Sequence, residues 1–231
     1  MFDNFFQRMW TIISAEYKAI LEGLGNTLLI AVFAFIIGLA IGCLIATIKL
    51  IPKKSTSYFL KAVEVIDNVY IAIFRGTPVV VQLLFIYYAI FKPMNVPALT
   101  VAIIVFGLNS GAYVSEIMRG GILSIDKGQL EAGRSLGLNY AETMFKIILP
   151  QGVKNAIPNL ANEFIALLKE TSIVGFITVI DLTKAIQIIM GWNYFYAAGY
   201  FLLGLVYFVI IYTLTKLIAV LERRLRRSDN R

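Results

Sequence analysis

The chain has 231 residues and a net charge of +7, and 59% of its residues are hydrophobic while only 15% are charged. Soluble domains carry about 45–50% apolar and about 25% charged residues, so this composition indicates an integral membrane protein without an added ATPase, sugar-binding or enzyme domain. Because histidine is absent and Cys43 is the single cysteine, an intramolecular disulfide or cysteine metal site is excluded, and we expect neither catalysis nor a cofactor in this chain.

The first part of the chain predicts an interfacial helix followed by a membrane span. Residues 1–22 place apolar side chains at helical spacing among charged ones, which is typical of an amphipathic helix in the membrane interface. Gly23–Ile48 has no charged residue and exceeds the roughly 20 residues that a helix needs to cross a bilayer. It carries Gly38-x-x-x-Gly42, which allows close helix approach, and we interpret this motif as ordinary packing.

The next predicted helices are interrupted by prolines. Residues 55–75 carry four charges, whereas Gly76–Phe91 is charge-free but only 16 residues long, which is marginal for a span. A single long second helix that begins in the cytosol and bends near Pro78 reconciles these facts. After a turn at 92–97, Pro93–Ser115 predicts the third span.

Residues 126–150 are the only long polar segment between very hydrophobic stretches. They predict two short capped helices and a stop. Asp126 with Gln129 suits a capping box for the first helix, and Gly137 suits the left-handed residue that ends that helix. Asn139 with Glu142 can cap the second helix, and Pro150 is expected to stop it. A polar helix–turn–helix between membrane spans has little packing use unless a partner docks on it.

This segment also carries a family resemblance. Its spacing of Glu-Ala-Gly, three residues, Gly, nine residues and Ile-x-Leu-Pro closely resembles the EAA loop of bacterial ABC-importer permeases, E-A-A-x3-G-x9-I-x-L-P. The departure is Gly133, where that pattern has a second alanine. Four further patches resemble the polar amino-acid branch of the family, and its permeases for the basic amino acids arginine, lysine and histidine are the most similar. The patches are Arg75-Gly76-Thr77-Pro78, Gln82, Glu116-x-x-Arg119-Gly120-Gly121-Ile122 and Lys169-Glu170-Thr171-Ser172.

The resemblance implies the type I ABC importer permease fold in the inner (cell) membrane of a bacterium. In that family the loop docks on a separate ATPase subunit, which binds ATP and Mg²⁺, and an extracellular solute-binding protein delivers the substrate. A second permease chain, identical or paralogous, completes the pore. The residues that carry over to ATPase coupling are Glu131, Ala132, Gly133, Gly137, Leu149 and Pro150. Without the resemblance, Glu131 would be interpreted as a solvated loop carboxylate.

The last part of the chain predicts two more spans. The fourth, Ile157–Ile180, is interrupted by Glu163, Lys169 and Glu170. The fifth, Ala185–Thr215, is long and begins with aromatic residues that suit a membrane interface.

Charge placement supports five spans with the N-terminus outside. On that topology 16 lysines and arginines fall in cytoplasmic segments and four in outer ones, which is a strong positive-inside bias. If the fourth segment did not cross, the C-terminal arginines would move outside and the bias would nearly vanish. We therefore expect one all-α transmembrane domain over 1–231, with the C-terminus in the cytoplasm and a cytoplasmic coupling loop at 116–156 between the third and fourth spans.

Glu163 is the sharpest candidate for a substrate contact, because an ionisable group inside a membrane costs at least about 2.5–3.5 kcal/mol and usually marks a pathway or a pair. It could pair with a basic residue on a neighbouring helix or receive a cationic substrate side chain. The resemblance implies that Asn162 lines the path and that Asn-Glu at this place is typical of basic amino-acid permeases. Further candidates, each of which could instead serve packing or gating, are Asn68, Gln82, Ser110 and Glu170.

Together these observations predict the permease subunit of an ABC importer that moves polar, and in particular basic, amino acids by ATP-driven alternating access. Glutamine, glutamate or other polar amino acids are alternative substrates, although membrane carboxylates repel an anion. An ion-coupled secondary transporter or channel could use Glu163 as a cation site, but such transporters usually show paired repeats and none is visible. A membrane scaffold that only recruits an ATPase is a third alternative.

Overall fold

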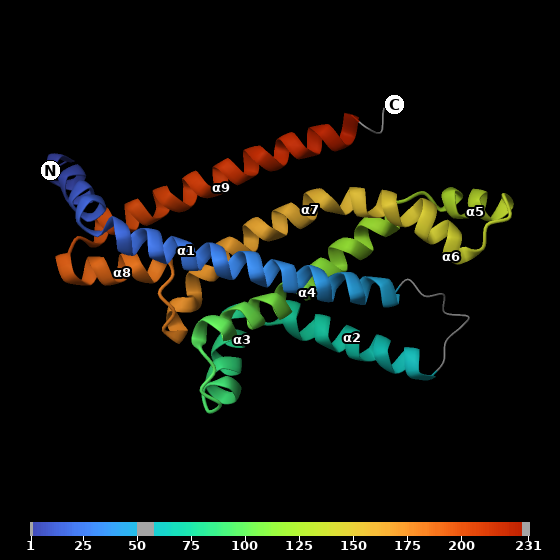
Figure 1. Ribbon diagram of the computed structural model, residues 1–231, viewed down its shortest axis with the longest axis horizontal. Coiled ribbons are helices and arrows are strands. Elements are labelled where there is room, and N and C mark those ends of the chain that lie inside the picture. Colours follow the sequence, from blue (N-terminus) through green and yellow to red (C-terminus); the bar gives the residue numbers. More distant parts are fainter. Residues whose placement is uncertain (1, 50–57, 228–231) are drawn as a thin grey trace.

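The computed structural model describes residues 2–49 and 58–227, and within them every regular element is helical. Figure 1 shows an elongated bundle in which α1 (Phe2–Lys49) runs alongside α4 (Ala98–Leu123). Three described helices are long and apolar enough to cross a membrane, and up to five spans result if each of two bent helix pairs counts as one. The all-helical membrane class is thus confirmed, whereas five spans and their orientation stay predictions.

Helix α4 forms the centre of the fold. It begins after Pro97 and runs to Leu123, beyond the end expected for the third span at Ser115. Its hydrophobic side chains pack against those of α1 and of other neighbouring elements. Burying each large hydrophobic side chain contributes about 1.5–3 kcal/mol to stability. Fully buried members of this core include Ile30, Leu83, Phe106, Leu167 and Val174.

The close contact between α1 and α4 depends on glycine. A Cβ atom on Gly38 would lie 2.8 Å from Cβ of Ser110, and one on Gly42 would lie 2.5 Å from Cγ1 of Val114. These distances leave no room for any side chain, so the two backbones approach as the Gly38-x-x-x-Gly42 spacing predicts. The motif therefore has a packing role in the described structure.

The N-terminal segment is continuous with the first span rather than a separate helix ending at 22. Its single break lies at Glu16, whose φ of −121° and ψ of 18° are not helical. The residues before the break lie over α8 (Leu182–Asn193) and α9 (Tyr196–Arg227), where Ile12 is fully buried in a cluster with Leu202. Its position in the membrane interface stays a prediction.

The bend expected near Pro78 is present, but it separates two helices. Helix α2 (Tyr58–Gly76) and the pair formed by α3 (Val79–Phe85) and the π-helical η2 (Ile86–Phe91) meet at a bend of 108°. A single long second helix is therefore wrong. Pro78 adopts an extended conformation (φ −63°, ψ 133°) as the N-cap of α3, and its ring and missing N–H prevent the helix from continuing.

The stop predicted at Pro150 is also wrong. Helix α6 (Tyr140–Thr143) passes directly into the π-helical η3 (Met144–Ile148) and then α7 (Leu149–Glu170). Pro150 lies in the first turn of α7, where the missing N–H of a proline is least costly. The polar segment and the fourth hydrophobic segment are consequently joined by an unbroken helical path.

The expected fifth span over 185–215 is broken between α8 and α9. Tyr194 adopts the left-handed conformation (φ 55°) and its N–H donates to the carbonyl of Met190 at 2.8 Å, which closes α8. The side chain of Met190 occupies the space where a Cβ on Gly199 would lie, so α9 packs back on α8. Before α8, the 3₁₀-helical η4 (Thr171–Ile177) extends α7, and the pair is bent by 52° relative to α8.

Candidate functional site

The helical hairpin of α5 (Lys127–Ser135) and α6 lies at one end of the molecule (Figure 1). Asp126 caps α5 by accepting a 2.6 Å hydrogen bond from the backbone N–H two residues on, without the box expected with Gln129. Gly137, with φ of 87°, ends the helix in the left-handed conformation. Asn139 and Glu142 form a complete capping box at the start of α6. The local sequence therefore specifies this hairpin almost alone.

The capping box also affects the charge of Glu142. The backbone N–H of Asn139 donates to its carboxylate at 2.9 Å, and this bond holds the pKa of the Glu142 carboxyl below its usual value. The ammonium of Lys146, at 3.6 Å, acts in the same direction. Glu142 is thus a structural carboxylate of the hairpin.

Gly133 is the point at which α5 rests on α6. A Cβ there would clash with Cγ2 of Thr143 and lie 2.9 Å from its Oγ1. Thr143 is fully buried, and its hydroxyl is held by a 3.0 Å hydrogen bond to the carbonyl of Asn139. The two residues before Gly133, Glu131 and Ala132, are exposed. The glycine that departs from the EAA pattern is therefore required by this packing.

Sequence reasoning missed two exposed apolar side chains of the hairpin. Leu136, at the C-cap of α5, is 82% exposed, and Phe145, on η3, is 61% exposed. The sequence could have indicated them, because both are large apolar residues in an otherwise polar segment. Of the other predicted coupling residues, Leu149 is half-buried beside the cluster around Ile122, whereas Pro150 is exposed.

Glu163 lies half-buried on α7, and the hydroxyl of Ser110 on α4 donates to its Oε1 at 3.1 Å. Ser110 is fully buried over Gly38, so the α1–α4 contact fixes the donor. No lysine or arginine among the described residues forms an ion pair with Glu163. The internal ion pair considered from the sequence is therefore not formed in the described part of the chain.

The remaining candidate substrate residues are not joined to Glu163 by any hydrogen bond or ion pair within the described residues. Asn162 is exposed on α7, Asn68 is exposed on α2, and Glu170 is half-buried at the end of α7. Nor does any group of three His, Cys, Asp or Glu side chains in the described ranges suit a metal ion.

Gln82 has a different environment. Its Nε2 donates to the carbonyls of Phe74 and Thr77, each at 3.0 Å, and its Oε1 accepts from Asn109 at 2.9 Å. Phe74 lies on α2, Thr77 at the bend and Asn109 on α4, whereas Gln82 itself lies on α3. The side chain is therefore engaged in holding the bend.

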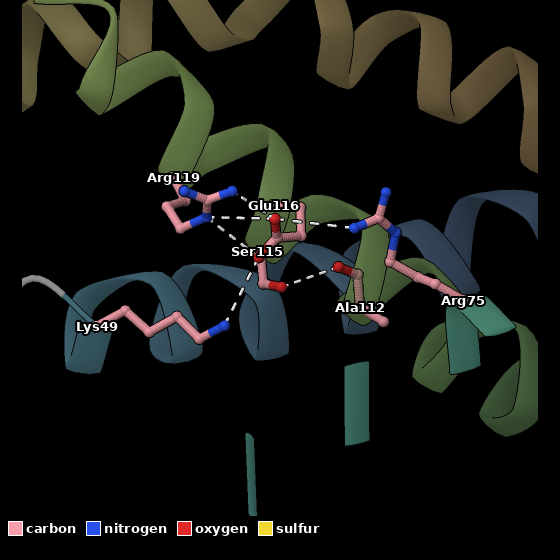
Figure 2. Close-up of polar contacts among 6 residues, drawn as sticks. All are labelled: Lys49, Arg75, Ala112, Ser115, Glu116 and Arg119. Carbon is pink, nitrogen blue, oxygen red and sulfur yellow. Dashed lines mark hydrogen bonds and ion pairs between the residues drawn. The ribbon is translucent and has the colours of Figure 1, made fainter. Parts of the chain in front are cut away.

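A cluster of charges around Glu116 was not anticipated. Figure 2 shows its carboxylate between Arg119 of the same helix, Lys49 of α1 and Arg75 of α2. The ion-pair distances are 2.8 Å, 3.6 Å and 3.8 Å respectively. The Arg75 guanidinium also lies 5.3 Å from the ring centroid of Tyr113. One carboxylate thus joins three helices. The sequence did not indicate this contact, because Lys49, Arg75 and Glu116 are far apart along the chain.

Comparison with known proteins gives consistent similarities. Residues 38–227 match the model of a family described as "Binding-protein-dependent transport system inner membrane component". The chain is 38% identical over 212 residues to the arginine transport system permease protein ArtQ of Bacillus subtilis, covering 91% of this chain and 94% of that protein. It is 37% identical over 208 residues to the putative glutamine transport system permease protein GlnP of Rickettsia felis, covering 89% and 92%.

A solved structure is similar as well. It is described as "Crystal structure of an amino acid ABC transporter with histidines" and matches with a TM-score of 0.85 and 40% identity, covering 92% of this chain and 96% of that chain. The names of the two permeases differ in the amino acid, one basic and one neutral. Overall similarity therefore identifies amino acids as cargo without selecting one.

Proposed function

The chain belongs to the binding-protein-dependent transport system inner membrane component family, and we propose that it is the permease through which an ABC importer carries basic amino acids. That it is a permease subunit of an amino-acid ABC importer follows from the family and its relatives. The preference for a basic substrate rests on one observation, the environment of Glu163.

The carboxylate of Glu163 has a neutral partner, the Ser110 hydroxyl, and no ion pair to a described basic side chain. A carboxylate removed from water is costly unless a cation meets it. The guanidinium or ammonium group of arginine or lysine would supply that cation from the substrate. In this proposal Glu163 receives the cationic side chain, and Ser110 orients the carboxylate.

The other proposed substrate contacts are chosen because their polar side chains are exposed or half-buried. Asn162 and Asn68 are exposed polar side chains on α7 and α2 and are offered as contacts for the backbone groups of the amino acid, with Glu170 as a weaker contact. Gln82 is not offered, because its amide already holds the α2–α3 bend.

We further propose five spans, with the N-terminus outside and the α5–α6 hairpin and C-terminus in the cytoplasm. A separate ATPase subunit, carrying ATP and Mg²⁺, would dock on the hairpin. The residues proposed for this contact are Glu131, Ala132, Gly133, Gly137, Leu149 and Pro150, with the exposed Leu136 and Phe145 added. A second permease chain and an extracellular solute-binding protein complete the transporter in the bacterial inner membrane.

The helical path from the hairpin to Glu163 suggests how the cycle is driven. Closure of the ATPase pair moves the hairpin, and α6, η3 and α7 follow one another without a loop from Tyr140 to Glu170. A rigid helix transmits such a displacement along its axis, so movement at the docking end reaches the carboxylate. Access to Glu163 then alternates between the two membrane faces as the paired bundles rock.

The test is competition for ATP-driven arginine uptake by the reconstituted transporter, with arginine, lysine, histidine, glutamine and glutamate as competitors. A charge-assisted hydrogen bond contributes about 1.5–3 kcal/mol, so Glu163→Gln should weaken competition by basic amino acids roughly ten- to hundredfold. Competition by glutamine should change little. Glu222→Gln, on α9 far along the sequence, is the matched control. An unchanged order of preference in Glu163→Gln would remove the specificity argument.

Glutamine is the second candidate, because the similarity to the glutamine permease of Rickettsia felis is almost as high as that to the arginine permease. The same competition decides between them. Glutamine as the strongest competitor in the unmodified transporter, with no effect of Glu163→Gln, would favour it.

A further inference from the structure

A cavity of about 590 Å³ lies between the first part of α1, the turn before α8 and α8 itself. Its charged lining residues are Glu16 and Glu22, its apolar wall includes Ile180 and Ile188, and Trp192 also lines it. Figure 1 shows this region at the opposite end of the molecule from α5 and α6. Neither glutamate forms an ion pair within the described residues.

The walls of the cavity are fixed by contacts between α1 and the turn before α8. The side-chain amide of Asn26 donates to the carbonyl of Ile180 at 2.9 Å, and the N–H of Leu182 donates to the hydroxyl of Thr27 at 3.1 Å. The break at Glu16 directs the preceding segment over α8 and α9. The cavity is therefore largely formed before anything binds, which lowers the entropy cost of binding.

The lining suits a cation at the end of an aliphatic stem. Both carboxylates carry the same charge, so an ammonium or guanidinium group would be attracted, and the isoleucines would cover the methylene groups of a lysine or arginine. Trp192 is 80% exposed, and an exposed tryptophan beside a pocket is a frequent anchor in protein interfaces. A phospholipid headgroup fits less well, because the carboxylates repel its phosphate.

We propose that this cavity receives a lysine or arginine side chain of the extracellular solute-binding protein. The inference rests on the proposed function, which places α5 and α6 in the cytoplasm and hence the cavity on the outer side. The family is described as binding-protein-dependent, so a protein of this kind must meet the outer surface. The cavity assigns a place and a charge to that contact, with Glu16 and Glu22 as the acceptors.

The experiment uses the complete transporter in liposomes, its cognate binding protein loaded with arginine, and ATPase activity as the readout. The double variant Glu16→Gln/Glu22→Gln should raise the binding-protein concentration that gives half-maximal stimulation by about tenfold. The maximal rate should be unchanged, and the salt dependence of half-saturation should become weaker. Trp192→Ala should act in the same direction, and Glu222→Gln, outside the cavity, should have no effect.

The outcomes separate this inference from the proposed function. If the binding protein stimulates the unmodified transporter but half-saturation is the same in the double variant, the cavity is not its docking site. A change seen only with free arginine, or only when the phosphatidylethanolamine content of the liposomes is varied, would assign the cavity to the amino acid or to lipid and overturn the inference. Absence of any stimulation in the unmodified transporter would instead contradict the proposed function.

Discussion

At the scale of single residues, the contact between Gly133 and Thr143 explains why the hairpin departs from the EAA pattern. Thr143 is buried and its rotamer is fixed by the carbonyl of Asn139, so it occupies the space that an alanine at 133 would need. The departure could be seen in the sequence. Its reason could not, because the contact joins two helices whose packing the spacing does not specify.

Gly133→Ala should therefore displace α5 from α6. Overpacking of this kind costs typically about 1–3 kcal/mol, which corresponds to roughly a five- to hundredfold weaker productive contact with the ATPase. Amino-acid uptake per ATP hydrolysed is the measurement. Adding Thr143→Ala, which leaves only the Cβ at 3.3 Å, should restore coupling. A double variant no better than Gly133→Ala would contradict this explanation.

The capping box predicts a pH dependence of hairpin stability. Glu142 has a lowered pKa in the folded hairpin because it accepts from the N–H of Asn139. A carboxyl with a lowered folded pKa contributes stability that is present above its unfolded pKa and is lost as the pH falls through the folded value. The melting temperature of the unmodified transporter should therefore be higher than that of the Glu142→Ala variant at neutral pH, and this difference should become smaller in acid. A difference independent of pH would show that the carboxylate does not contribute.

Glu163 illustrates the limit of prediction for the candidate site. A carboxylate in an apolar stretch is visible in the sequence, and its importance follows from the cost of burying charge. Its partner Ser110 lies on α4, 53 positions earlier, and only the packing of α4 against α7 brings the two together. Residue type indicated the chemistry, whereas the contact required the fold.

At the scale of helices, local signals predicted where most elements lie and that the chain bends near Pro78, but not the other breaks. The caps at Asn139 and Gly137 act within a few residues, so the sequence was sufficient there. The breaks at Glu16 and Tyr194 carry no proline. They depend on packing of the first segment and α9 against α8, which hydropathy alone does not encode.

The α2–α3 bend is an element-scale feature with a single central residue. Replacing Gln82 by leucine would remove its hydrogen bonds to Phe74, Thr77 and Asn109, each of which contributes about 0.5–1.5 kcal/mol. We expect a clearly lower melting temperature of the assembled transporter and an unchanged order of competing amino acids. An unchanged melting temperature with an altered order would indicate that Gln82 contacts substrate instead.

At the scale of the whole molecule, composition was sufficient to predict a helical membrane protein, and the described residues are helical throughout their regular elements. The number of crossings is less directly encoded, because two candidate spans are bent pairs. The fold does not give the orientation, and the proposed orientation rests on the positive-inside bias. With that orientation, the hairpin would face the proposed ATPase partner and the cavity at the opposite end would face the binding protein.

We propose that ATP hydrolysis on another subunit drives this permease through the α5–α6 hairpin. The measurement is uptake of radiolabelled arginine into liposomes that contain this chain, with and without the ATPase subunits, the binding protein and ATP. ATP is supplied on the side of the membrane where the ATPase subunits lie. We expect uptake only when all of these components are present, and we expect the Glu131→Ala variant to lose uptake. Uptake by this chain alone, driven by an ion gradient, would contradict it.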